Sequence, residues 1–391
     1  MRVVILNYNG GTFVLRSVGA VVATEWPLDR LEVVVIDNAS TDESAARIAA
    51  QYPRVDLRLR TVNTGFVANN DAFSDLADVD YVALVNNDAF VEPGWLTPLV
   101  AALEADDGLG AVCPKVLFSH SYVEVEVEGL PTDDALVEVL VDGQDMTRFV
   151  HGLAGFAEPH PADGAARKLA ASTIRMQVPA GETAELRFSD VAAARVLRLP
   201  ADAFDVVNNA GNVLTTNYYG ADRGFHERDG PAWDVASDVF AFCGNGVVFR
   251  SRFLAEVGGF DERLFAYYED LELSWRGREA GWRYQYVPEA RVRHLHGATA
   301  VAGSRLHAVL NERNRLVVLF QYLPWDRVAI VVVQFLTATA SYAVRDVLRP
   351  LTHAQRPRPE ILSRRLAALA GFLRLLPSSL RLRRARPASV D

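Results

Sequence analysis

The sequence predicts an α/β fold: a mostly parallel sheet with helices on both faces, an inserted small antiparallel β-sandwich, and C-terminal helices. Three observations support this prediction. Short apolar runs alternate with helical segments over residues 1–118, strand-like alternation follows over residues 119–204, and long helical periods occupy the end of the chain. The 391 residues suffice for more than one domain, and the hydrophobic share of 50% is typical of globular proteins.

Four apolar runs in the first 118 residues predict the strands, and helical segments follow the first three of them. The strands are expected at Val3–Leu6, Leu31–Ile36, Val55–Thr61 and Tyr81–Val85. The helices are expected up to about Thr24, at Glu43–Gln51 and around Val67–Leu76. A polar cluster ends each strand: Asn7–Gly10, Asp37–Asp42, Asn63–Phe66 and Asn86–Asp88. Such strand ends are where open α/β sheets bind ligands.

In residues 119–204 the hydrophobic pattern changes from a helical spacing to the alternation of β-strands. Tyr122–Val127 alternates strictly between two types of side chain, as a half-buried strand does. Further short strands, separated by Gly and Pro turns, are expected at Ala135–Val141, Ile174–Val178, Glu185–Phe188 and Val196–Leu199. This spacing predicts an antiparallel β-sandwich inserted into the α/β body. The α/β signals resume near Val206.

The C-terminal part is helical and basic. A helix is expected at Arg305–Leu323, and the uncharged run Val328–Val344 fits a spanning helix, an interfacial or docked helix, or a buried core helix. Ile361–Leu376 has an apolar side and arginines on another side. Nine arginines stand against two acidic residues after residue 352. We expect residues 324–391 to bind an anionic membrane surface, with a disordered basic tail as the alternative.

Composition excludes several classes of protein. The net charge of −9, carried by an acidic body, argues against nucleic acid as a partner. Cys113 and Cys243 have neither the spacing of a zinc site nor that of a disulfide framework. The sequence has no glycine-rich dinucleotide or P-loop motif.

The acidic pair Glu269-Asp270 is the first candidate for catalysis. It lies among aromatic residues that include Tyr268 and Trp275. Partial desolvation raises the proton affinity of a carboxylate, which suits a general base. The alternative is that the pair opens a helix, because acidic side chains complement the helix dipole.

Asp88, His294 and His296 are candidate metal ligands. Asp88 follows an apolar strand, where a carboxylate can hold Mg²⁺ or Mn²⁺, or can cap the next helix. The two histidines alternate in RVRHLHGAT, so both would lie on one face and could ligate the same ion. The alternative is a pair of surface or core histidines.

Asp37 is placed to accept hydrogen bonds from a nucleobase or ribose at the end of the second strand. Asn63, Gly65 and Asn69 are expected to line the same crevice, with Gly65 allowing close backbone approach. A helix N-terminus nearby could contact phosphate.

Six motifs together carry a resemblance to a known family. They are VVILNYNG from Val3, VVIDNASTDES from Val34, NTGFVANNDAF from Asn63, LVNNDAFVEPGWL from Leu84, CGNGVVFRSRFLAEVGGFDERLFAYYEDLELSWR from Cys243, and VPEARVRHLHGAT from Val287. The chain resembles family-2 glycosyltransferases of the GT-A fold, close to a bacterial rhamnosyltransferase-like branch. The resemblance covers about residues 2–118 and 206–323.

The resemblance implies a role for each matching residue. Asp270 matches the catalytic base, with Glu269 beside it. Asp88 matches the last residue of a DXD-type metal motif that here reads Asn86-Asn87-Asp88, without its first carboxylate. His294 matches the late metal ligand better than His296 does. The expected donor-binding residues are Asn7, Asp37, Asn38, Asn63, Gly65, Asn69, Asn86, Asn87 and Asp88. The expected acceptor-binding residues are Cys243, Gly244, Asn245, Tyr268 and Trp275.

The implied activity is inverting transfer of a sugar from a nucleotide-sugar donor, with dTDP-L-rhamnose expected first and UDP-galactofuranose next. The acceptor would be a lipid-linked saccharide or polysaccharide in bacterial cell-wall or surface-glycan synthesis, at the cytoplasmic face of the membrane. The cofactor would be Mg²⁺ or Mn²⁺. A catalytically silent sugar-binding protein of the same fold is the alternative, and a homo-oligomer is left open.

This interpretation divides the chain into four parts. Residues 1–118 would bind the nucleotide sugar, and residues 205–323 would bind the acceptor and carry the base. Residues 119–204 form the inserted β module, which could bind polymeric acceptor, contact a second copy or brace the fold. Residues 324–391 form the membrane-associating part.

Overall fold

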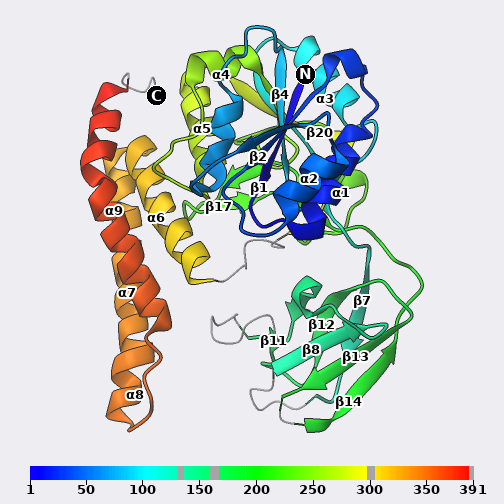
Figure 1. Ribbon diagram of the computed structural model, residues 1–391. Coiled ribbons are helices and arrows are strands. Elements are labelled where there is room, and N and C mark those ends of the chain that lie inside the picture. Colours follow the sequence, from blue (N-terminus) through cyan, green and yellow to red (C-terminus); the bar gives the residue numbers. More distant parts are fainter. Residues whose placement is uncertain (131–135, 158–166, 190, 297–303, 387–391) are drawn as a thin grey trace. The chain divides into compact units, whose positions relative to one another are not determined.

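The computed structural model describes residues 1–130, 136–157, 167–189, 191–296 and 304–386 (Figure 1). The chain divides into two compact units. The first unit consists of Met1–Val116, Asn209–Gly224 and Pro231–Asp391, and the second of Leu117–Asn208 and Phe225–Gly230. The expected start of one strand, Ala135, and the end of the last motif, residues 297–299, lie outside the described residues.

The first unit is built on a mixed sheet whose parallel part has the order β3-β2-β1-β4. Its strands are β1 (Arg2–Asn7), β2 (Glu32–Asp37), β3 (Asp56–Leu59) and β4 (Tyr81–Asn86). The connections contain α1 (Gly11–Val22), α2 (Ser44–Gln51) and the 3₁₀ helix η2 (Gly65–Ala72). The β1 side chains are almost all buried, because this central strand is covered on both faces.

The other half of the sheet is antiparallel. Strand β19 (Val248–Arg250) pairs with β4 and with β6 (Leu109–Phe118), while β20 (Arg283–His294) pairs with β18 (Ser237–Val239) and β5 (Ala89–Val91). Helices α3 (Leu96–Ala105), α4 (Ser251–Val257) and α5 (Glu269–Glu279) accompany these strands. Short strands β16 (Asn212–Leu214) and β17 (Gly220–Asp222) form a hairpin, and β15 (Val207–Asn209) pairs with β6.

The second unit contains two antiparallel sheets around one apolar core. One sheet has the order β10-β12-β7: β10 (His151–Ala154), β12 (Ile174–Pro179) and β7 (Tyr122–Val127). The other consists of β11 (Arg167–Lys168), β8 (Leu136–Val141), β13 (Thr183–Phe188), β14 (Val191–Arg198) and the short β9 (Gln144–Asp145). Both faces contribute valines to the core, as expected for a sandwich.

The C-terminal helices belong to the first unit and share a core with α5. They are α6 (Arg305–Tyr322), α7 (Trp325–Ala343), a π-helical turn (Val344–Leu348), α8 (Arg349–Thr352) and α9 (Glu360–Ala385). Helix α6 lies beside α9 (Figure 1). The predicted fold class is therefore confirmed: a sheet with a parallel core, an inserted antiparallel module and C-terminal helices.

Two local expectations were wrong. The segment around Val67–Leu76 is the 3₁₀ helix η2, because polar side chains there compete with the helical backbone; the amide of Asn69 donates to the Phe66 carbonyl at 2.9 Å. The last helix does not end near Leu376 but continues through Pro377 to Ala385. Arg386 just beyond it forms an ion pair with Glu279, which fixes the basic end of α9 on the domain.

Candidate active site

The ends of β1 and β2 present a fixed carboxylate. Asn7 and Asp37 are opposite each other in the parallel register, and the Asn7 amide donates to the Asp37 carboxylate at 2.7 Å. The second Asp37 oxygen accepts the Ser40 backbone N–H at 3.1 Å. Because both side chains are buried, these contacts fix the direction of the carboxylate.

Asn38 connects the end of β2 to the next loop. Its amide nitrogen donates to the side-chain oxygen of Asn63 at 2.9 Å and to the Gly65 carbonyl at 3.0 Å. Gly65 has φ +77°, and a Cβ there would lie 2.2 Å from the Phe265 carbonyl oxygen. Glycine is therefore required by both the backbone angle and the close approach. Asn69 is buried, and its side-chain oxygen has no hydrogen-bond partner within the described parts of the chain.

Asp88 and His294 form the centre of the expected metal site. The pairing of β20 with β5 brings them together, and the His294 Nε2 lies 3.0 Å from the Asp88 Oδ1. Both residues are buried, whereas His296 is exposed with its ring 5.6 Å from that of His294. Asn87 is buried beside Gly10, where a Cβ would lie 3.0 Å from its amide nitrogen.

The donor chemistry of this pair fits a divalent cation such as Mn²⁺, which accepts carboxylate oxygen and imidazole nitrogen. Across the residues that the structure describes, no group of three His, Cys, Asp or Glu side chains is placed to hold an ion by itself. Asp88 and His294 would therefore supply only part of a coordination sphere, and other ligands would have to complete it.

Asp270 lies in the first turn of α5, directly after an unusual backbone segment. Phe265, Tyr267 and Tyr268 have φ values of +67°, +69° and +68°. Bulky residues rarely adopt this left-handed conformation. The Asp270 Oδ2 accepts the Asn212 amide at 2.8 Å.

The environment of Asp270 changes its proton affinity. Burial is the largest cause and raises the pKa of Asp270 to about 6, with the Asp222 carboxylate adding to the effect. The backbone amides of Leu271 and Gly244 and the Asn212 side chain act in the opposite direction. Asp270 is consequently ionised at neutral pH yet more basic than an ordinary aspartate.

Glu269 is the more buried member of the pair. Burial, followed by the charge of Asp270, raises its pKa well above the usual range. One of its carboxyl oxygens has no hydrogen-bond partner among the residues that the structure places. Glu269 therefore favours the neutral form, which leaves the negative charge on Asp270.

Asp222, Asn209 and Asn212 were not identified from the sequence. The Asn209 amide donates to Asp222 at 2.6 Å and to Asn212 at 2.7 Å, and Asn212 in turn donates to Asp270. Asp222 also interacts electrostatically with His294, so these contacts connect Asp270 with the expected metal site. The sequence feature that could have identified the two asparagines is the Asn-rich run 208–212, where the chain returns from the inserted module.

The segment Cys243–Asn245 lies between the two halves of the site. Burial, then the carboxylates of Asp222 and Asp270, raise the pKa of the Cys243 thiol well above its usual range. The Asn245 side-chain oxygen accepts the Asn86 backbone N–H at 3.2 Å. Gly244 is packed against Phe66, whose ring would be 2.9 Å from an added Cβ.

Tyr268 and Trp275 have different surroundings. The Tyr268 hydroxyl accepts the Gly220 N–H at 3.0 Å, and burial raises its pKa to about 12. Trp275 instead stacks on Tyr322 of α6, with ring centroids 5.2 Å apart. Both side chains pack against the core shared with the C-terminal helices, and Tyr268 also reaches the β17 hairpin.

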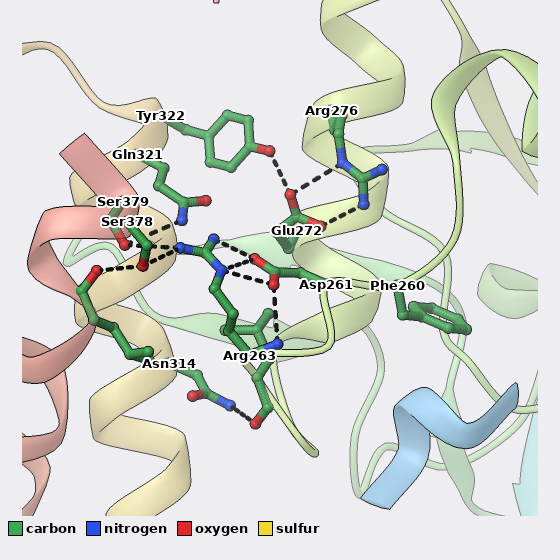
Figure 2. A network of polar contacts seen from close by, with 12 residues as sticks. Phe260, Asp261, Arg263, Glu272, Arg276, Asn314, Gln321, Tyr322, Ser378 and Ser379 are labelled. Atoms are coloured by element: carbon green, nitrogen blue, oxygen red, sulfur yellow. Dashed lines mark hydrogen bonds and ion pairs between the residues drawn. The ribbon is translucent and has the colours of Figure 1, made fainter. Parts of the chain in front are cut away.

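A polar network joins the loop before α5 to the C-terminal helices (Figure 2). Arg263 makes an ion pair with Asp261 and donates to the hydroxyls of Ser378 and Ser379 at 3.0 and 3.3 Å. Farther along α5, the Tyr322 hydroxyl donates to Glu272 at 2.6 Å, and Glu272 pairs with Arg276 at 2.7 Å.

Comparison with known proteins agrees with the motifs. Residues 2–126 match the model of "Glycosyl transferase family 2", and residues 191–353 match that of "Glycosyl transferase family group 2". The chain belongs to glycosyltransferase family 2, and its sheet, with a parallel core continued by antiparallel strands, is of the expected GT-A class.

Similar proteins include a curated bacterial enzyme. The N-acetylglucosaminyl-diphospho-decaprenol L-rhamnosyltransferase of Mycobacterium tuberculosis is 24% identical over 306 residues, which cover 75% of each chain. Among solved structures, GalNAc-T7 with UDP, GalNAc and Mn²⁺ is 15% identical with a TM-score of 0.49, and the match covers 100% of this chain and 59% of that one. A mannosyltransferase of Pyrobaculum calidifontis with GDP-Man and Mn²⁺ is 16% identical, with coverage of 95% and 86% and a TM-score of 0.44.

Proposed function

We propose that this glycosyltransferase moves a sugar, in the first instance L-rhamnose from dTDP-L-rhamnose, to a hydroxyl of a lipid-linked saccharide during cell-wall synthesis. The rhamnosyltransferase resemblance and the name of the M. tuberculosis relative support this donor and this acceptor class. The single observation that carries the catalytic proposal is Asp270, a carboxylate of raised pKa held by Asn212 at the start of α5.

Asp270 acts as the general base in this proposal. It takes the proton from the acceptor hydroxyl while the hydroxyl oxygen attacks the anomeric carbon and the bond to the nucleoside diphosphate breaks. One such displacement inverts the anomeric configuration. Glu269 remains neutral and adds no competing charge beside the base.

The donor is assigned to the ends of β1, β2 and β4. Asp37, oriented by Asn7, would accept N–H groups of the base, and the Asn38–Asn63–Gly65 contacts would shape the nucleotide crevice. Asp88 and His294 would hold a divalent cation. When bound, such a cation neutralises the charge that develops on the departing diphosphate.

The C-terminal helices are proposed to dock the enzyme on the cytoplasmic membrane surface. The helical stretch Trp325–Thr352 is the one among the described residues that is long and apolar enough to cross a membrane, and 22% of its apolar window is buried. In α7, Val328, Val331 and Phe335 are buried against the protein, but most of the apolar window is not buried, which argues against a buried core helix. The opposite face exposes apolar side chains, including Val333 and Leu336. A helix with one face on the protein and one apolar face outward fits interfacial docking.

The test uses purified full-length enzyme, a panel of nucleotide sugars, Mn²⁺ or Mg²⁺, and a lipid-linked N-acetylglucosaminyl diphosphate. We expect transfer from dTDP-L-rhamnose and loss of activity with a chelator. Asp270→Asn should lower kcat about 10²–10⁴-fold, while nucleotide binding measured by thermal shift is retained. Glu256→Gln, on the exposed side of α4, is the control and should keep wild-type activity.

Each alternative result has a defined meaning. Transfer from a UDP-sugar alone would replace the donor assignment and retain the mechanism. Release of no nucleoside diphosphate from any donor would favour a silent sugar-binding protein. Full activity in Asp270→Asn would remove the base assignment.

A further inference from the structure

Asn314 of α6 makes an unusual set of contacts with the segment that precedes the base. Its side chain is completely buried, and its amide nitrogen donates to the carbonyls of Leu264, Ala266 and Tyr267 at 2.9, 2.8 and 2.7 Å. Figure 2 shows this side chain extending from α6 toward the loop. The two N–H groups of this amide are therefore shared among three carbonyls that lie outside helices and strands.

The orientation of this amide is fixed by its neighbour. Arg313 donates from Nε to the Asn314 side-chain oxygen at 2.8 Å, so the Asn314 nitrogen must face the loop. The same guanidinium donates to the Leu264 carbonyl at 2.6 Å. An amide turned the other way would place its oxygen against three carbonyl oxygens, which is unfavourable.

The segment that Asn314 holds requires such a restraint. Phe265, Tyr267 and Tyr268 all have left-handed backbone angles, and such conformations persist only where the surroundings impose them. Tyr268 is the last residue before α5, so its conformation sets where Glu269 and Asp270 begin. On its other side, the segment meets Gly65 at the Phe265 carbonyl.

We propose that Asn314 is a positioning residue for glycosyl transfer, and that its amide holds residues 264–268 in the left-handed conformation from which Asp270 is presented to the acceptor. This inference rests on the proposed role of Asp270 as the base. Asn314 touches no reacting group in this proposal and acts through the loop backbone.

Asn314→Asp tests the role of the Asn314 amide as a hydrogen-bond donor to the loop, because it preserves the shape of the side chain and replaces the amide nitrogen by oxygen. We expect kcat to fall at least about 100-fold, since a small misplacement of a catalytic group has effects of this order. Nucleotide affinity should fall much less than kcat, because the segment meets the donor-binding loop only beside Gly65, at the Phe265 carbonyl. Asn311→Asp is the matched control one turn earlier on α6, where the amide donates to the His307 carbonyl of its own helix, and it should behave as wild type.

Asn314→Ser separates a positioning role from a merely structural one and adds no titratable group. Three titratable groups lie around Asp270: Asp222, whose charge raises the pKa of Asp270, and Glu269 and Cys243, whose pKa values Asp270 raises. The acidic limb of the kcat/KM profile is the fall in activity as Asp270 becomes protonated. If the loop loosens and water reaches Asp270, the effect of burial on its pKa is reduced, so this limb moves to lower pH. A variant that only lowers the amount of folded protein scales the whole profile without moving this limb.

A rescue experiment tests the inference even if the single Asn314 variants fold less well than the wild type. Glycine adopts positive φ without steric cost, so Tyr267→Gly in the Asn314→Ser background should recover at least about tenfold in kcat. Failure of this rescue, or Asn314→Asp with more than about a tenth of wild-type kcat, overturns the inference. If Asp270→Asn is inactive in the same assay, the proposed function stands in either case; if it is active, the proposed function itself fails.

Discussion

Asn212 donates a hydrogen bond from its amide to the Asp270 carboxylate at 2.8 Å, although 57 residues separate them along the chain. Asn212 lies in the β16–β17 hairpin, and it also donates to the Phe242 carbonyl at 3.1 Å. The base of the proposed reaction is thus held from a strand that the chain forms on its return from the inserted module. This contact stabilises the ionised form of Asp270 against the effect of burial.

Asn212→Ala should move the acidic limb of the pH profile upward. The hydrogen bond that it removes lowers the pKa of Asp270, so its loss raises that pKa. A hydrogen bond contributes about 1 kcal/mol, and one pKa unit corresponds to about 1.4 kcal/mol, which gives a shift of somewhat under one unit. The measurement is kcat/KM against pH. A limb that moves downward would show that Asn212 does not stabilise the ionised base.

Asp222→Asn should move the same limb in the opposite direction. The Asp222 carboxylate raises the pKa of Asp270 through its charge, and an amide keeps the shape and still accepts from Asn209. Water reaches the exposed Asp222 and screens its charge, and burial by its neighbours raises its own pKa, which lowers its negative charge at acidic pH. The expected shift is therefore only a few tenths of a unit. Low-salt buffer should enlarge the shift. A profile identical to that of the wild type at low salt would contradict the electrostatic contact.

Asp88→Asn should weaken metal activation more than nucleotide binding. It replaces an anionic oxygen donor by a neutral one beside His294, so the Mn²⁺ concentration for half-maximal activity should rise at least about tenfold. The measurement is a Mn²⁺ titration at saturating donor. His296→Ala is a useful comparison, because its exposed side chain should contribute less than Asp88. Equal Mn²⁺ dependence in Asp88→Asn and wild type would remove Asp88 from the metal site.

Charges on the outer face of α7 should release the enzyme from membranes. Val333→Glu together with Leu336→Glu changes exposed apolar residues, so the double variant should no longer sediment with vesicles that contain phosphatidylglycerol. Its activity on a water-soluble acceptor should stay unchanged. Gln334→Glu, exposed on the same helix, is the single-charge control. Undiminished sedimentation of the double variant would contradict docking through α7.

Local patterns in the sequence were sufficient for most of the first unit. The apolar runs at Val3–Leu6 and Tyr81–Val85 became buried neighbouring strands, and the polar clusters after them lie at adjacent strand ends. Motif order identified Asp37, Asp88 and Asp270 as candidates, because each follows or precedes a segment with a clear period. Their catalytic and binding roles stay predictions.

What sequence reasoning missed depends on contacts between distant segments. Asn212 and Asp222 lie in a short hairpin whose sequence shows no clear hydrophobic periodicity. Only the tertiary structure shows that they lie close to Asp270. Helix α9 passes Pro377 because Arg383 donates to the Phe320 carbonyl and Arg386 pairs with Glu279, and neither contact can be inferred from local composition. The stacking of Trp275 on Tyr322 of α6 is another such long-range contact, and the role of Trp275 at the acceptor site stays a prediction.

The Arg263 contacts with Ser378 and Ser379 have a practical consequence for anyone who shortens this protein. Apolar C-terminal segments are often deleted to obtain soluble material for crystals or assays. Here, a deletion that begins at α9 would remove Ser378 and Ser379, the partners of Arg263. Arg263 lies just before the segment 264–268 that leads to Asp270, so the truncated protein would lose a contact that holds the start of this segment. Solubility is better sought by substitution on the outer face of α7, with the last helix left in place.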